Sequence, residues 1–334
     1  MRKTVLFLAA LLLVLSAGFA QAGQKYRIGG ATYGLVGEYM KLWATALERH
    51  PAVVQGLVDL TIFDGRYDAS VQQSQFETMS SQGYDAILFV PIDIEAGAAA
   101  VATAHANDVI VVGSNTRVNS DLLTAYIGSN DVISGYMEAK AVIAKMGGKG
   151  NVVIIEGPIG QSAQIERREG NLKAIAEYPE VKVLEMRTAN WSRAEALALM
   201  ENWLTAHPGQ IDGVIGQNDE MALGAVQAIK AAGLDVKDFA VAGIDGVSDA
   251  IMAVKNGEMD LSILQDAVSQ AQGALDIALG YLVKDYQPMS DCWKDYPEMK
   301  WNGGKDKNYD VPWTPITKDN ADEQWAKRQD LTAR

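Results

Sequence analysis

Short apolar runs alternate with amphipathic stretches along most of the chain. The apolar runs are rich in β-branched residues and end at glycine or polar residues, which is typical of strands buried on both faces. Ten runs are expected as strands: Tyr26–Ala31, Val58–Phe63, Ala86–Val90, Val109–Gly113, Tyr126–Gly128, Asn151–Glu156, Val181–Met186, Gly213–Gly216, Ala240–Ile244 and Leu261–Leu264.

The segments between these strands carry a helical period. Residues 219–232 are an example, because their apolar positions recur at i, i+3, i+4 and i+7. Four or five strand-helix pairs precede about residue 128, and a second set runs from about 150 to 265. This alternation predicts an α/β protein with two doubly wound, Rossmann-like lobes, each built on a parallel sheet.

The pattern changes beyond Pro288. Four tryptophans lie there among Asp, Lys, Gly and Pro without a clear period, at 293, 301, 313 and 325. Residues 291–334 are therefore expected to form an irregular extension packed on the surface.

The amino terminus has the organisation of a secretory signal peptide. Arg2 and Lys3 precede the apolar run Val5–Leu15, and Ala20-Gln21-Ala22 offers small residues at a cleavage site. The run is shorter than the roughly 20 apolar residues that a spanning helix needs. Residues 1–22 are thus expected to be removed on export to the periplasm, leaving a protein without a membrane insertion.

Charge and cysteine content exclude several classes of function. The formal net charge is −13, and loss of Arg2 and Lys3 makes the chain more acidic still. Nucleic acid is a poor partner for such a chain, since binding to phosphates depends on clustered Lys and Arg. Cys292 is the single cysteine, which excludes an intramolecular disulfide and a cysteine-based zinc cluster. No metal ion or cofactor is expected.

Polar residues follow several of the second-lobe strands. Ligands of open α/β sheets bind beyond the carboxyl ends of the strands, so these positions are site candidates. Arg167, Asn218, Asp245 and Gln265 would converge on one rim as rigidly held donors and acceptors for hydroxyl groups. Each has a structural alternative: Asn218 is also a helix cap, and Arg167 would pair in solvent with a nearby glutamate at 156, 166 or 169.

Trp191 has two interpretations. It stands before Ser192 and Glu195, which form a capping box, so it suits the position of a hydrophobic staple. Its flat ring would equally stack on the C–H face of a sugar. Both interpretations stay open at this stage.

These motifs resemble the ribose-type periplasmic sugar-binding proteins of ABC importers, whose fold is shared by the effector domain of LacI-type repressors. The resemblance covers nearly all of residues 24–286 and is strongest in Glu156–Pro158, Asn202–Pro208, Gln217–Ala225 and Gly243–Gly246. It implies two lobes joined by crossing hinge strands, with a ligand cleft between them. The first lobe would comprise residues 23–129 with 266–290, and the second residues 130–265.

The resemblance also implies the site residues. Arg167, Asn218, Asp245 and Gln265 match hydroxyl-binding positions, and Trp191 matches an aromatic residue that packs on the ring. In the first lobe, Thr32–Tyr39 replaces the usual Asn-Asn-Pro-Phe-Phe string, and Gly113–Arg117 replaces an Asp-Arg pair. The first-lobe candidates are Thr32, Tyr33, Tyr39 and Asn115.

The first-lobe departures argue against ribose as the ligand. A site that hydrogen-bonds one set of hydroxyls strongly rejects analogues that lack them, so changed donors indicate a changed ligand. The expected function is a high-affinity receptor for another pentose or hexose, a polyol or a cyclitol. It would act as a monomer that delivers the ligand to an ABC permease, with a chemoreceptor as a further candidate partner.

Other functions fit the sequence less well. A non-sugar signal or chemotaxis ligand remains an alternative on the same fold. A DNA-binding repressor would need a helix-turn-helix where the signal peptide stands. An exported carbohydrate-active enzyme would need an acid-base pair, for which Asp245 and Glu38 are the candidates, while the three histidines are scattered.

Overall fold

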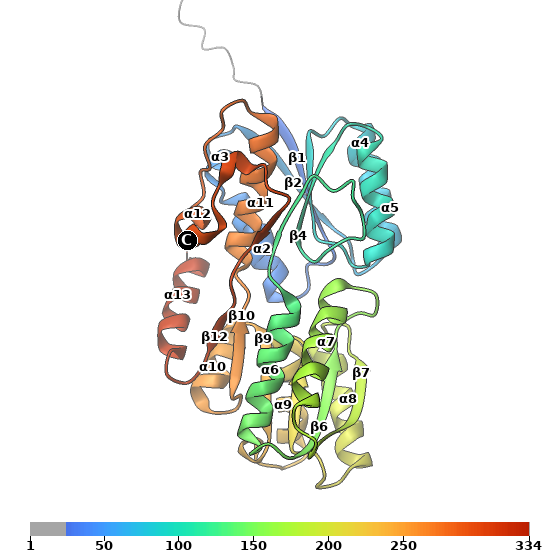
Figure 1. Cartoon of the computed structure of the whole chain (residues 1–334), viewed down its shortest axis with the longest axis vertical. Helices are drawn as coiled ribbons and strands as arrows, with labels where there is room; N and C mark the ends of the chain where they lie inside the picture. Colours follow the sequence, from blue (N-terminus) through green and yellow to red (C-terminus); the bar gives the residue numbers. More distant parts are fainter. Residues whose placement is uncertain (1–24, 334) are drawn as a thin grey trace, which may run out of the picture.

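The computed structural model describes residues 25–333, so the expected signal peptide at 1–22 lies outside the described residues. Within that range the chain forms two α/β lobes stacked along the long axis of the molecule, each around a six-stranded sheet (Figure 1). The fold class expected from the sequence is confirmed.

The first sheet has the order β11-β5-β4-β3-β1-β2, and its neighbouring strands pair in parallel. Its strands are β1 (Tyr26–Thr32), β2 (Val58–Asp64), β3 (Ala86–Phe89), β4 (Ile110–Asn115), β5 (Ala125–Gly128) and β11 (Asn308–Asp310). The second sheet has the order β12-β10-β9-β8-β6-β7 and is parallel except for β12. Its strands are β6 (Gly150–Glu156), β7 (Val181–Thr188), β8 (Gly213–Gly216), β9 (Ala240–Asp245), β10 (Leu261–Leu264) and β12 (Thr314–Ile316). All ten strands expected from the sequence are present.

Helices cover both faces of each sheet. The first lobe has α2 (Glu38–Glu48), α3 (Pro51–Val54), α4 (Ala69–Ser81), α5 (Ile94–His105), α11 (Ala267–Leu282) and α12 (Cys292–Asp295). The second lobe has α6 (Asp131–Lys145), α7 (Ser162–Ala176), α8 (Arg193–Ala206), α9 (Asp219–Ala231) and α10 (Ser248–Asn256). The last helix is α13 (Ala321–Ala333), and short 3-10 turns lie at Val236–Asp238, Pro297–Met299 and Asn302–Gly304. Helix α9 confirms the helix expected over 219–232.

Local chemistry explains where the helices begin. The side chains of Asp68, Asp93, Ser192 and Asp266 accept hydrogen bonds from backbone N–H groups in the first turns of α4, α5, α8 and α11. Such caps satisfy donors that have no partner inside the helix. The same caps fix the loops that follow the strands, and these loops face the space between the lobes.

The C-terminal segment corrects the sequence prediction. Residues 291–334 were expected to be irregular, yet β11 joins the first sheet, β12 joins the second sheet antiparallel to β10, and α13 follows. Each of these strands has three residues, too few to show an alternating pattern, and α13 is mostly polar. The segment therefore adds a connection between the lobes beyond those at Gly128–Asp131 and Leu264–Ala267.

The stretch before β11 is anchored on the first lobe by one buried carboxylate. Asp276 in α11 accepts hydrogen bonds from the side chains of Tyr286, Ser290 and Trp293 at 2.6 to 2.9 Å. It also accepts from the backbone N–H groups of Met289 and Ser290, and the His50 Nε2 lies 3.2 Å from it. Because Ala52 N–H donates to the His50 Nδ1, the Nε2 carries the proton. The tryptophan-rich stretch is thus held by hydrogen bonds as well as by aromatic packing.

Candidate functional site

A small cavity lies between the two lobes, at the carboxyl ends of the strands. It is lined by Tyr33, Tyr39, Asn115, Thr116, Gln161, Ala163, Arg167, Trp191, Asn218, Asp245 and Gln265. Eight of the nine residues proposed from the sequence are among these. The cavity contains about 240 Å³ of empty space, but the centre of a water molecule fits into only about 10 Å³ of it. A ligand larger than water therefore enters when the surrounding groups move apart.

Thr32 is the ninth candidate, and it does not line the cavity. It is the last residue of β1 and is fully buried, and its hydroxyl donates to the Phe63 carbonyl at 3.1 Å. Its role in the fold is to join the ends of β1 and β2. We therefore withdraw Thr32 as a ligand contact.

Arg167 is the central cation of the cavity. Its side chain is 3 % exposed, so the alternative of a solvated pair with a glutamate is wrong. The guanidinium donates from Nε to Asp131 at 2.7 Å and from the terminal nitrogens to the Gln217 carbonyl at 2.6 Å and the Gln265 Oε1 at 3.2 Å. Asp131, the first residue of α6, thus neutralises Arg167 and fixes the plane of the guanidinium.

Gln265 and Asn218 each use only part of their amide within the protein. The Gln265 Oε1 accepts from Arg167, while its Nε2 is buried without a hydrogen-bond partner among the described residues. The Asn218 Oδ1 accepts from Met221 N–H at 2.9 Å and caps α9, which leaves its Nδ2 beside the cavity. A buried donor without a partner costs free energy, so a ligand oxygen here would stabilise the protein.

Asp245 supplies the carboxylate of the cavity. It ends β9 with φ of 126°, a backbone conformation that is strained for a residue with a side chain. Burial raises the pKa of Asp245 well above its ordinary value, an effect that the nearby Arg167 opposes. Its carboxylate makes no hydrogen bond to the part of the chain that the structure describes. Strained, unsatisfied groups of this kind gather at binding sites.

The first lobe contributes an aromatic and amide wall. The Tyr39 hydroxyl donates to Gln270 Oε1 at 2.6 Å and accepts from Asn115 Nδ2 at 3.0 Å. Burial raises the pKa of Tyr39, so its hydroxyl keeps its proton. Asn115, at the end of β4, has φ of 64°, and its Oδ1 remains as an acceptor. Tyr33 packs edge to face on Tyr67 with ring centroids 5.5 Å apart.

Trp191 combines packing with a place in the cavity. Its ring packs on Gly157, where an added Cβ would lie only 2.1 Å from the ring. The Arg167 guanidinium carbon lies 5.5 Å from the ring centroid. The indole Nε1 donates to Gln161 Oε1 at 2.7 Å, and Gln161 Nε2 donates across the lobes to the Pro91 carbonyl at 2.9 Å. Trp191 therefore closes the second-lobe side of the cavity.

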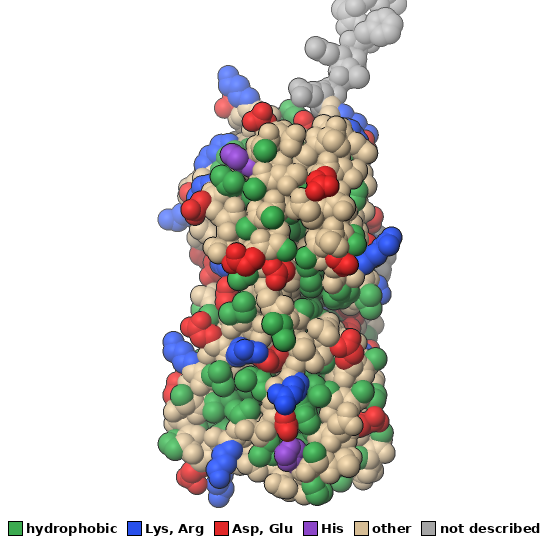
Figure 2. Space-filling view, turned by 90° about the vertical axis from the view of Figure 1, so that its right-hand side faces the viewer, with side chains coloured by type: hydrophobic (Ala, Val, Ile, Leu, Met, Phe, Trp, Pro, Cys, Tyr) green, Lys and Arg blue, Asp and Glu red, His purple; other side chains and the backbone are tan. Residues whose placement is uncertain are grey.

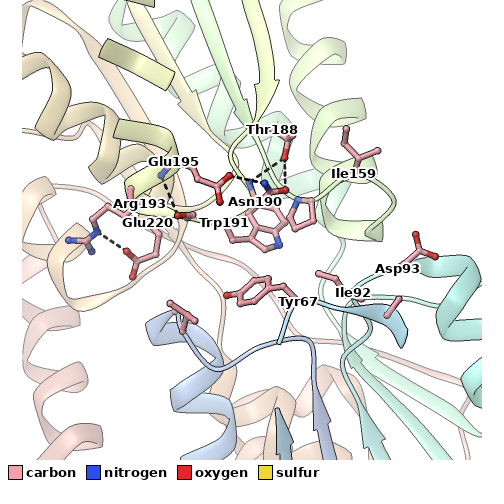
Figure 3. Close-up of a pocket in the computed structure, with 16 residues that line it drawn as sticks. Tyr67, Ile92, Asp93, Ile159, Thr188, Asn190, Trp191, Arg193, Glu195 and Glu220 are labelled. Carbon is pink, nitrogen blue, oxygen red and sulfur yellow. Dashed lines mark hydrogen bonds and ion pairs between the residues drawn. The ribbon is translucent and has the colours of Figure 1, made fainter. Parts of the chain in front are cut away.

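A larger, open cleft of about 960 Å³ lies outside Trp191. Figure 3 shows Tyr67, Ile92 and Asp93 of the first lobe on one side of this cleft and Ile159 of the second lobe across from them. Viewed from the side, hydrophobic and acidic side chains lie along the boundary of the lobes (Figure 2). The cleft leads from solvent to Trp191, which lines both spaces.

Sequence reasoning missed Asp131, Thr116 and Gln161. Asp131 follows the cap Asn130 and looks like an ordinary first-turn acid of a helix. Gln161 stands before α7 in a Gly-Pro-rich loop whose path no local pattern reveals. The one signal that could have indicated Asp131 is that a buried arginine requires a carboxylate partner.

The arrangement suits reversible hydrogen bonding to several hydroxyls. Donors remain at Asn218 Nδ2 and Gln265 Nε2, and acceptors at Asp245 and Asn115 Oδ1. Glu38, the proposed partner of Asp245 in glycoside chemistry, lies outside the cavity and accepts from Ser248 N–H at 3.0 Å. None of the three histidines lines the cavity. The site is that of a two-lobed binding protein.

The chain belongs to the periplasmic binding protein family. Residues 34–285 match the family described as "Periplasmic binding protein domain". Over 265 residues the chain is 36 % identical to a xylitol-binding protein of Mycolicibacterium smegmatis, a match that spans 79 % of this chain and 70 % of the relative. Over 285 residues it is 34 % identical to a putative rhizopine-binding protein of Rhizobium meliloti, spanning 84 % and 90 %.

Solved structures agree in fold. An ABC transporter solute-binding protein of Bacillus halodurans C-125 with bound myo-inositol superposes with a TM-score of 0.79 at 29 % identity, over 91 % of this chain and 98 % of the other. No helix among residues 25–333 is long and apolar enough to cross a membrane. Within the same residues, His, Cys, Asp and Glu form no group of three or more that could hold a metal ion.

Proposed function

We propose that this protein is a periplasmic receptor for a small polyhydroxyl compound, which it delivers to an ABC import permease. The observation that carries the proposal is the cavity between the lobes, in which two amide donors and a buried carboxylate have no hydrogen-bond partner among residues 25–333. Hydroxyl groups offer both a donor and an acceptor, so a polyol satisfies all of these groups at once.

We infer that the ligand belongs to a narrower class than sugars in general. The relatives described above are named for xylitol and rhizopine, and the related solved structure contains myo-inositol. The cavity is small, and the aromatic rings of Tyr33 and Trp191 lie at its sides. We infer an acyclic polyol or a cyclitol as the ligand, in preference to ribose.

The ligand is held by contacts from both lobes. We assign residues 23–129 with 266–290 to one lobe and 130–265 to the other, and we assign Tyr33, Tyr39, Asn115, Arg167, Trp191, Asn218, Asp245 and Gln265 to ligand binding. Closure of the lobes over the ligand would create the surface that the permease recognises and binds. We further propose that the protein is exported with cleavage after Ala22 and that it is a monomer. A chemoreceptor would be a second binding partner of the closed form.

Equilibrium dialysis of purified residues 23–334 against radiolabelled xylitol and myo-inositol tests this function. A receptor concentrates at least one of these compounds, and chromatography of the released label recovers it unchanged. Recovery of a chemically altered compound would instead support the exported enzyme. Failure to retain any polyol, including a wider set of pentitols, hexitols and inositols, would refute the proposal.

A further inference from the structure

The C-terminal helix α13 lies along the side of the molecule and reaches from the second lobe to the first (Figure 1). At its beginning, Asp322 pairs with Lys255 of α10 in the second lobe at 2.5 Å. At its end, the Leu331 carbonyl accepts from Arg49 of the first lobe at 2.7 Å. The helix therefore contacts both lobes.

Arg328 of α13 contacts both the second lobe and the first. Its side chain is buried, its Nη2 donates to the Gly246 carbonyl at 2.5 Å, and its Nη1 lies 3.6 Å from Glu38 Oε1. Gly246 directly follows Asp245, and Glu38 directly precedes Tyr39. Arg328 thus contacts the neighbours of one ligand-site residue from each lobe.

Glu38 also bonds directly across the lobes. Its Oε1 accepts from the backbone N–H of Ser248 at 3.0 Å and from the Ser248 hydroxyl at 2.8 Å. Ser248 begins α10, and the preceding residue Val247 offers no side-chain cap. A carboxylate of the first lobe therefore caps a helix of the second lobe, where the helix dipole favours negative charge.

We propose that Glu38, Ser248 and Arg328 form a clasp that stabilises the closed form of the receptor. Glu38 and Arg328 are positioning residues, because neither lines the ligand cavity. Hinge opening would move α2 away from α10 and α13, separate Glu38 from Ser248 and Arg328, and leave the start of α10 without its cap. The inference rests on the proposed function, since it concerns closure over a ligand.

The clasp has a quantitative consequence. A ligand that binds only the closed form has an apparent affinity proportional to the fraction of protein that is closed. Loss of hydrogen bonds to a charged group at this interface lowers the closed-to-open ratio on the order of tenfold. The apparent affinity falls by up to the same factor, and by the full factor where the open form predominates without ligand. The ligand also dissociates faster, although every cavity contact is intact.

Pulsed dipolar spectroscopy tests the clasp by measuring the distance between the two lobes. Spin labels at the exposed sites Glu77→Cys and Lys173→Cys report the distance between the lobes, and the native Cys292 is buried. The label-to-label distances of Glu38→Ala and of Arg328→Lys are each compared with those of the spin-labelled protein that carries neither substitution. The comparison is made without ligand and during titration with xylitol or myo-inositol. Glu38→Gln replaces Glu38→Ala if the latter fails to fold. Lys327→Gln is the matched control, because Lys327 pairs with Glu323 on its own helix.

The clasp predicts that Glu38→Ala and Arg328→Lys shift the ligand-free lobes toward the open distance, need up to tenfold more polyol to close, or do both, while Lys327→Gln behaves as the parent protein. Distance distributions and titrations that superpose for all four proteins would overturn it. If no polyol changes the distance in any protein, the proposed function fails, and the comparison without ligand still decides whether the clasp exists.

Discussion

At the residue scale, Asn218 uses the two ends of its amide differently. Its Oδ1 caps α9 through Met221 N–H, while its Nδ2 faces the cavity. The sequence left a choice between a cap and a ligand contact; the structure shows the cap at Oδ1, and we propose the ligand contact for Nδ2. This division makes it possible to remove the ligand contact without removing the cap.

Asn218→Asp should therefore separate binding from folding. Asp caps a helix about as well as Asn, so the melting temperature of the ligand-free protein should barely change. The lost donor and the new charge beside Asp245 should weaken polyol binding by about 10- to 100-fold in calorimetric titration. Asn130→Asp, the same change at the cap of α6, is the control and should bind normally. Equal affinity of Asn218→Asp and the parent would show that Nδ2 does not bind the ligand.

Asp245 should make binding depend on pH. Burial raises its pKa in the ligand-free protein, whereas hydroxyls that donate to the carboxylate favour its charged form and lower the pKa. Affinity should therefore be full above the ligand-free pKa and fall as the pH drops through it, with a proton released on binding. Titrations over a range of pH test this. Asp245→Asn should bind more weakly without the pH dependence, and the same dependence in both proteins would contradict the account.

At the scale of elements, the sequence predicted the strands well because each buried strand is a continuous apolar run bounded by polar or glycine residues. The rim residues of the second lobe followed from the same pattern, since Asn218, Asp245 and Gln265 each stand at a strand end. The first-lobe wall was harder to predict, because Gln270 reaches Tyr39 and Asn115 from a helix far along the chain. Long-range partners of this kind leave no local signal.

The structure of the C-terminal segment also depends on long-range partners that the local sequence does not reveal. Neither β11 nor β12 is long enough for a recognisable period, and their pairing depends on sheet edges formed about 180 residues earlier for β11 and about 50 for β12. The aromatic residues were visible in the sequence, but their anchor, Asp276, lies inside an ordinary helix. Only the fold brings them together.

Asp276→Asn should weaken the attachment of this segment to the first lobe. Burial acts to raise the pKa of Asp276, but the hydrogen bonds from His50, Ser290 and Tyr286 outweigh it, and the pKa lies below its ordinary value. The carboxylate thus stabilises the fold above its unfolded pKa of about 3.9, and this stability is lost as the pH falls through the folded pKa.

The free energy of unfolding at neutral pH should fall by about 3 kcal/mol in Asp276→Asn, measured by urea denaturation. Asp291→Asn, at an exposed site in the same segment, is the control and should change the stability little. An unchanged midpoint for Asp276→Asn would show that aromatic packing alone holds the segment.

At the scale of the whole molecule, the two lobes are held together around the cavity by contacts on opposite sides. Gln161 bonds to the Pro91 carbonyl beside the cavity, Arg117 N–H donates to Ser162 Oγ at 2.7 Å, and Glu38 bonds to Ser248. The tail strands β11 and β12 link the two sheets as well. A ligand that adds hydrogen bonds to both lobes would shift this arrangement further toward closure.

Thermal unfolding of purified residues 23–334 with a panel of polyols, cyclitols, pentoses and hexoses tests the central claim most directly. A polyol or cyclitol present at 1,000 times its dissociation constant should raise the free energy of unfolding by about 4 kcal/mol, and hence raise the melting temperature. The account predicts such a shift for at least one of these compounds and a smaller one for ribose. A panel in which no polyhydroxyl compound raises the melting temperature would contradict it.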